Sequence, residues 1–285
     1  SDMSLIPFLT LGLNYIPNDP IGAPEILNLG ASSLHTNFKI SSSGEQILLS
    51  DLSENVIDVV DSLVIPTDIS YGRQPDGEDL WMFFEEPTPN QTNNNSSGFE
   101  SSCQEPIFSV DPGFFSGPIE VTVELTEEGY PIFYTLDGSD PTTSSSVYSE
   151  SISISETAVL RASMIHSNCL FSEISTSSYF INEDMNLPII SLTSDPYNLF
   201  DDEYGIYVMG NDAEWNFPHF GANFWEDWER PIHIELFEPN GELGFSLDAG
   251  VKIFGGWSRG MPQKSLAIYA RPDYGTSEIN YQIFP

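Results

Sequence analysis

Near its C-terminal end the chain carries a glycine-rich motif flanked by cations, and this motif could hold a phosphate group. Glycine lets the backbone approach an anion closely, while arginine and lysine supply charge and donors. Five of the eight basic residues lie between positions 230 and 271. The same composition occurs in ordinary structural turns. The motif therefore fits two interpretations, a nucleotide or phosphate site and a simple turn. The residues concerned are Gly255, Gly256, Ser258, Arg259 and Lys264.

Phosphoryl transfer would need more than this loop. It requires acidic metal ligands and a residue that positions the acceptor opposite the phosphate. The 43 acidic residues form no recognisable pair of that kind, nor the paired carboxylates of a glycosidase. The sequence contains no GxSxG, HExxH or Walker motif. We therefore predict no catalytic residues in this chain.

Six large aromatic side chains are interspersed with acids between positions 215 and 228. Exposed rings of this kind could stack against sugars, and the alternative is that they pack a long loop onto its own domain. His219 and His233 lie in or near this region, but no further ligands at metal-binding spacing accompany them. The candidate glycan platform consists of Trp215, Trp225 and Trp228.

The two cysteines, Cys103 and Cys169, are 66 residues apart and flank one candidate domain. In an exported protein they could form a disulfide that stabilises the domain by roughly 4 kcal/mol in the loop-entropy model. As two free buried thiols they would carry no function. Neither cysteine belongs to a CxxC motif, so thiol chemistry is not predicted.

The charge balance excludes some partners. The chain has 285 residues, with 43 Asp and Glu against 8 Lys and Arg, and a net charge of −35. Such a chain is repelled by nucleic acid and by anionic membranes. The acids either form a solvated surface or include ligands for Ca²⁺ between domains, although no EF-hand loop is visible. No apolar stretch approaches the ~20 residues of a transmembrane helix.

The spacing of turn residues predicts a mostly β chain. Glycine and proline number 21 each, which favours short strands and many turns. One helical turn is expected at 195–200. Strands are expected at 34–40, 46–50, 56–60, 119–125, 132–136, 151–154, 158–164, 177–181, 187–192, 205–208, 230–237, 250–254 and 264–269.

The first domain, predicted at residues 1–90, resembles the bacterial lamin-tail family, an Ig-like β-sandwich of exported proteins. The likeness covers residues 34–90, its second half. It rests on the segments His35–Ser41, Ile69–Arg73, Pro75–Gly77 and Pro87–Pro89. The polar residues 91–102 are then predicted to be a linker.

The second domain is predicted at residues 103–182. Its nonapeptide Tyr134–Thr142 (YTLDGSDPT), followed by Tyr148 and the strand around Arg161, resembles the small Ig-like domain appended to chitobiases and hexosaminidases. The resemblance implies a second β-sandwich.

Residues 185–285 resemble the opening of a CotH-type domain, the α+β atypical kinase of spore-coat proteins. The likeness rests on Asp248–Ile253, the glycine-rich motif and Gln263–Ser265, with Gln263 where the family commonly has lysine. It implies that Lys264 pairs with the phosphates of ATP, bound with Mg²⁺, and that Arg259 orients the loop. The family's carboxylates would lie beyond Pro285, which leaves this domain incomplete and inactive.

Three functions follow from these resemblances. The first is a secreted or cell-surface modular protein whose Ig-like domains are spacer or adhesion modules that present the CotH-like domain. The second is the N-terminal portion of an atypical extracellular protein kinase, and the third is a carbohydrate-binding accessory protein. The expected partner is a protein or glycan at the cell surface. Fold analogy alone does not separate these functions.

Overall fold

The chain is mostly β, as the sequence predicts, with sandwich-like sheets that agree with Ig-like domains. The computed structural model describes residues 13–14, 25–26, 44–51, 53–66, 69–89, 91–124, 130–167, 169–170 and 172–283. It divides into two compact units, Ser1–Gly98 and Phe99–Pro285, and each is described by itself. The division falls within the segment predicted to be a linker. The strand expected at 34–40 lies outside the described residues.

The first unit contains a hairpin that the turn residues predict. Strands β3 (Ile47–Ser50) and β4 (Val56–Val60) pair antiparallel. Asp51 closes the turn between them, because its Oδ1 accepts hydrogen bonds from the backbone N of Ser53 at 2.8 Å and of Asn55 at 2.9 Å. The expected strands and turn are therefore confirmed.

A second hairpin of this unit joins β5 (Ser70–Arg73) to β6 (Trp81–Phe84). Gly77 takes a φ of +81° in the turn, a conformation that glycine adopts without strain. Two short strands, β1 (Leu13–Asn14) and β2 (Glu25–Ile26), also pair antiparallel.

The polar segment after Pro89 is folded onto the β5–β6 hairpin. It forms the 3₁₀ turn η2 (Asn93–Asn95). The Asn93 Nδ2 donates to the Arg73 carbonyl at 2.9 Å, and the Gln74 Nε2 donates to the carbonyls of Asn93 and Ser96, both at 2.7 Å. Residues 91–98 are therefore not a free linker, because side-chain amides that can donate and accept are used to fasten them.

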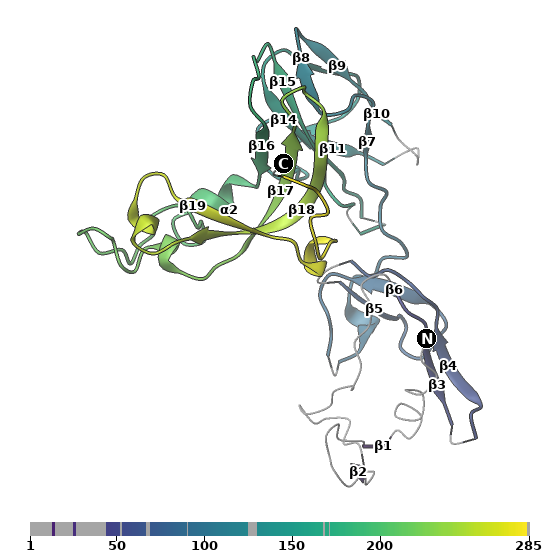
Figure 1. Cartoon of the computed structure of the whole chain (residues 1–285). Coiled ribbons are helices and arrows are strands. Elements are labelled where there is room, and N and C mark those ends of the chain that lie inside the picture. Colours follow the sequence, from purple (N-terminus) through teal and green to yellow (C-terminus); the bar gives the residue numbers. More distant parts are fainter. Residues whose placement is uncertain are drawn as a thin grey trace. The chain divides into compact units, whose positions relative to one another are not determined.

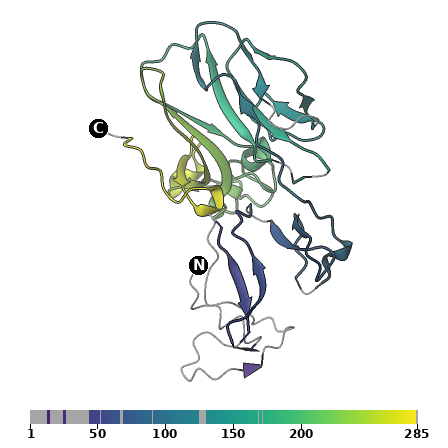
Figure 2. The same ribbon diagram turned by 90° about the vertical axis from the view of Figure 1, so that its right-hand side faces the viewer.

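The N-terminal part of the second unit is a sandwich built on a five-stranded sheet in the order β12-β11-β14-β15-β8. Strand β8 pairs parallel to β15, and the other neighbours are antiparallel. Two further pairs, β9–β13 and β7–β10, complete the sandwich (Figure 2). The strands are β7 (Ile107–Phe108), β8 (Gly113–Phe115), β9 (Ile119–Val121), β10 (Val123–Glu124), β11 (Ile132–Thr135), β12 (Ser146–Val147), β13 (Ile152–Ile154), β14 (Ala158–Met164) and β15 (Ser175–Ile181).

Alternating side chains from these strands form one hydrophobic core. Strand β14 contributes Leu160, Ala162 and Met164, which meet Val121 and Tyr179. Each of these side chains is at most 1% exposed. Removing this apolar surface from water is the main force that holds the sheets together.

The C-terminal part of the second unit is a four-stranded antiparallel sheet in the order β16-β17-β18-β19. Its central strands form a long curved pair (Figure 1). The elements are β16 (Ile189–Thr193), α2 (Pro196–Phe200), η3 (Asn223–Trp225), β17 (Arg230–Phe237), β18 (Leu243–Phe254), η4 (Trp257–Gly260), β19 (Ser265–Tyr269) and η5 (Pro272–Tyr274).

The strand predicted at 205–208 is wrong, because this segment turns back over α2. The backbone N of Ile206 donates to Asn198 at 3.1 Å, and that of Tyr207 donates to Leu199 at 2.9 Å. Ile206 is 1% exposed and lies in the core of the sheet. Its apolar run is explained by core packing over the sheet rather than by strand pairing.

Candidate functional site

The five residues predicted to hold phosphate lie together in the loop between β18 and β19. Gly255 has a φ of +110°, and a Cβ there would lie 2.4 Å from the Ser258 Oγ, which explains the glycine. Arg259 donates from Nε to the Gly255 carbonyl at 2.8 Å and from Nη1 to the Phe224 carbonyl at 3.1 Å. The arginine therefore fastens the loop to η3.

Lys264 is used in the same way. Its Nζ donates to the carbonyls of Arg259 and Met261, both at 2.9 Å, and lies 3.9 Å from the centre of the Phe224 ring. Burial lowers the pKa of Lys264. Both cations of the motif thus bind backbone carbonyls, and a phosphate would have to compete with those bonds.

The three predicted platform tryptophans differ in burial. Trp215 is 89% exposed. Trp225 donates from Nε1 to the Pro218 carbonyl at 2.9 Å, and Trp228 lies beside Arg230 with 5.0 Å between the ring centre and Cζ. Trp225 and Trp228 therefore pack the loop onto its own sheet, the alternative that the sequence left open.

Two other exposed aromatic side chains lie near the glycine-rich loop. Trp257 is 66% exposed and Phe217 is 46% exposed. Their ring centres are 5.9 Å apart in an edge-on arrangement. Trp257 lies within the glycine-rich motif Gly255–Gly260, so the exposed aromatic ring could have been predicted from the same motif as the phosphate site.

Cys103 and Cys169 form a disulfide. Both are 5% exposed and belong to the core of the sandwich. The bond lies beside a backbone pairing, in which the N of Cys103 donates to the Leu170 carbonyl at 2.7 Å. The disulfide therefore closes the sandwich at the edge where its first residues meet the segment before β15.

A metal site would require several acidic or other ligand side chains to lie close together. Within the described part of the chain, no group of three or more His, Cys, Asp or Glu side chains could hold a metal ion. The Ca²⁺ between domains stays a prediction. No helix among them is long and apolar enough to cross a membrane.

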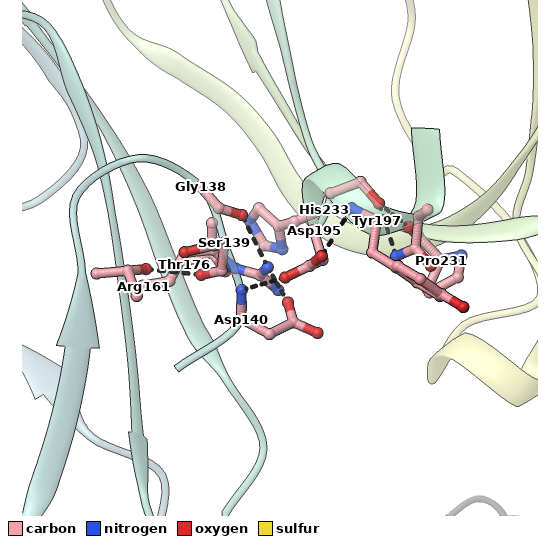
Figure 3. A network of polar contacts seen from close by, with 12 residues as sticks. Gly138, Ser139, Asp140, Arg161, Thr176, Asp195, Tyr197, Pro231 and His233 are labelled. Carbon is pink, nitrogen blue, oxygen red and sulfur yellow. Dashed lines mark hydrogen bonds and ion pairs between the residues drawn. The ribbon is translucent and has the colours of Figure 1, made fainter. Parts of the chain in front are cut away.

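The nonapeptide of the sandwich is bonded to the N-terminal end of α2 through a carboxylate, beside an ion pair within the sandwich (Figure 3). Arg161 forms an ion pair with Asp140 and donates from Nη1 to the Gly138 carbonyl at 3.1 Å. The backbone N of Asp140 donates to the Asp195 Oδ2 at 2.8 Å, while the Asp195 Oδ1 accepts from the backbone N of Tyr197 at 2.8 Å. One carboxylate therefore caps α2 and binds the sandwich.

A second contact lies between β15 and the strands β16 and β17. The Glu235 Oε2 accepts from the backbone N of Ser178 at 3.0 Å, and the hydroxyls of Ser178 and Ser191 are 2.7 Å apart. The Phe180 and Phe237 rings lie edge to face, with centres 5.3 Å apart. We call these two contacts the joint, defined by Asp140, Arg161, Ser178, Asp195 and Glu235.

Burial at the joint raises the pKa values of two carboxyl groups, those of Asp140 and Glu235. It raises the pKa of Asp140, against the effect of Arg161, and Asp195 raises it further. Burial also raises the pKa of Glu235, against its hydrogen bond with Ser178 and the nearby His233. No sequence motif marks Glu235, because its partner is a backbone N 57 residues away.

Comparison with known proteins locates one family in the chain. Residues 110–176 match the family described as the chitobiase/beta-hexosaminidase C-terminal domain. No curated protein sequence and no solved structure matches the chain. The matched residues include the nonapeptide and Arg161, and they exclude the residues that carry the lamin-tail and CotH resemblances. The sandwich of the second unit thus contains a match to the chitobiase/beta-hexosaminidase C-terminal domain.

Proposed function

We propose that this chain is a secreted or cell-surface modular protein, in which the sandwich is a non-catalytic spacer that presents the C-terminal, CotH-like sheet. The observation that carries this proposal is the joint. It combines an ion pair, a shared helix cap and a buried carboxyl, and its residues are distant in sequence. A spacer that must hold its neighbour in a fixed orientation needs such contacts, because domain interfaces without them allow relative motion.

The glycine-rich loop supports the non-catalytic part of the proposal. Arg259 and Lys264 use their donors to fold the loop. The disulfide between Cys103 and Cys169 supports export, since such bonds persist mainly in oxidising compartments.

The spacer proposal is tested by ¹⁵N relaxation on the whole chain. If the sandwich and the sheet are held together, amides of β14 and β18 report one rotational correlation time. A clearly shorter time for β18 than for β14 would show independent motion and refute the spacer. The variant Asp195→Ala, which removes the shared cap, should separate the two times, whereas Asp227→Ala, which removes an exposed carboxylate bonded to Lys252, should leave them equal.

A second candidate function is carbohydrate binding at the exposed rings of Trp215, Phe217 and Trp257. The rings of Phe217 and Trp257 are in contact, Trp215 lies two residues before Phe217, and all three are exposed. Exposed apolar surface of this kind commonly marks a binding site. We expect the double variant W215A/W257A to lose at least about tenfold in affinity for any hit on a glycan array, as central aromatic anchors do. Phe200→Ala removes an equally accessible ring elsewhere, 58% exposed, and should not change binding. Equal losses of glycan affinity in the two variants would contradict binding at these rings.

Thermal melting with Mg-ATP tests the kinase alternative. With millimolar Mg-ATP the melting temperature should stay constant if Arg259 and Lys264 keep their carbonyl partners. A rise that Lys264→Met abolishes would instead support the N-terminal portion of an atypical kinase.

A further inference from the structure

We propose that the joint is a proton-operated latch: it is tight while the buried carboxyl of Glu235 carries a proton, and it loosens when that carboxyl ionises. This inference goes beyond the spacer role, since it makes the stiffness of the spacer depend on pH. It does not require the CotH-like assignment or any ligand.

The geometry around Glu235 is unfavourable for a charge. The residue is 0% exposed. Its Oε2 accepts from the backbone N of Ser178 at 3.0 Å, and the Ser178 side chain is the other hydrogen-bonding group that favours its ionised form. Its Oε1 is buried and has no hydrogen-bond partner among the described residues. A buried carboxylate needs several donors to replace water, whereas a neutral carboxyl loses much less on burial.

The elements packed around Glu235 supply little compensating positive charge. On its own strand, His233 favours the ionised form, but its Nδ1 already lies 2.7 Å from the Asp248 Oδ1 of β18. On β16 the nearest polar partner is the uncharged Ser191, paired opposite Glu235. On β15, Tyr179 has its pKa raised to about 12, mainly by burial and in part by Glu235.

The remaining charges at the joint are mostly acidic. Arg161 of β14 is committed to Asp140. Asp140 itself is repelled by Asp195 across the joint. Glu173, in the segment before β15, has its pKa raised by burial and then by the charges of Glu105 and Asp248. The sandwich and the sheet therefore face each other with carboxyl groups on both sides.

The direction of the pH effect follows from linkage. The pKa of Glu235 is higher in the closed joint than the ordinary 4.5. The closed state therefore binds more protons than the open state between those two values. Its stability is complete below the ordinary pKa and falls as pH rises through the pKa of the closed joint. One proton changes the closing equilibrium by up to about tenfold per pH unit in that window.

Hydrogen exchange at the Ser178 amide tests the latch, because this N–H is bonded to Glu235. In the whole chain, the protection factor should fall by up to about tenfold per pH unit as Glu235 ionises. The variant Glu235→Gln keeps the shape and removes the charge, so its protection should be constant over the same range. The matched control Glu120→Gln changes a carboxylate bonded only to Ser151 Oγ and should behave like the wild type.

Two outcomes would overturn the proposal. One is a wild-type protection factor that does not fall with pH, and the other is an equal fall in Glu235→Gln. If Glu235→Gln does not fold, the carboxyl ¹³C shift of Glu235 in the wild type decides instead. A titration midpoint above the ordinary glutamate value supports the latch, and a midpoint at or below that value excludes it.

Discussion

Arg161 is a nearly buried cation whose donors are divided among three partners. It is 8% exposed, binds Asp140, and donates to the Gly138 carbonyl and to the Thr176 Oγ1, the last at 3.2 Å. Charge-assisted bonds in such surroundings are stronger than those between neutral groups. The arginine therefore holds the nonapeptide in the shape that meets Asp195.

We expect Arg161→Ala to destabilise the second unit by about 2–3 kcal/mol, because it leaves polar groups of the sandwich without their charged donor. Urea unfolding of the whole chain measures this change. Lys252→Ala is the matched control. Its Nζ lies 3.2 Å from Asp227, which is 89% exposed, and 3.6 Å from Glu229, and pairs near solvent contribute about 1 kcal/mol or less. Similar losses in the two variants would contradict the role assigned to Arg161.

At the scale of elements, the loop between β18 and β19 is shaped by its backbone. Gly255 takes a φ of +110° and lies close to Ser258. The 3₁₀ turn η4 follows at once, and Arg259 and Lys264 close it through carbonyls. The loop thus has a defined conformation without any ligand.

Gly255→Ala should cost about 1–3 kcal/mol, because an L side chain is strained at this φ and meets the Ser258 hydroxyl. Gly117→Ala, at a position where a Cβ would meet nothing within 4 Å, should change stability by less than about 0.5 kcal/mol. Differential scanning calorimetry compares the two. If Gly255→Ala melts with the wild type, the loop is not held as described.

Much of the element structure was predictable, for reasons that particular residues show. The turn at Asp51 and the strands beside it follow from local chemistry, in which a carboxylate accepts backbone N–H groups. The sandwich of the second unit was likewise predictable, from the resemblance carried by the nonapeptide Tyr134–Thr142. The fastening of Asn93 and the burial of Glu235 depend on partners that are distant in sequence or have no distinctive side chain. Ile206 was assigned to a strand because an apolar run does not say whether it pairs or packs.

At the scale of the whole molecule, charge is the dominant property. A net charge of −35 on 285 residues repels itself within each compact unit and destabilises the folded state. Seven ion pairs among the described residues join basic to acidic side chains, and they involve four of the lysines and arginines and one histidine. Among the described residues these pairs use six carboxylates, against 43 acidic residues in the chain.

Salt should stabilise the protein by screening this repulsion. Between 10 mM and 500 mM NaCl we expect a gain of about 1 kcal/mol, equivalent to about 2–4 °C in melting temperature. Circular dichroism melts measure it, and equal concentrations of an uncharged osmolyte separate screening from general solvent effects. A constant or falling melting temperature with NaCl would show that repulsion does not limit stability.

The disulfide between Cys103 and Cys169 has a mechanical consequence. A pulling force along the chain would enter the sandwich at Cys103, cross the covalent bond to Cys169 and continue into β15. The residues between the two cysteines would carry none of the load. Their extended length, roughly 200 Å at 3.3–3.6 Å per residue, would stay hidden under tension. Under tension, the segment enclosed by the disulfide would therefore add no length to the chain.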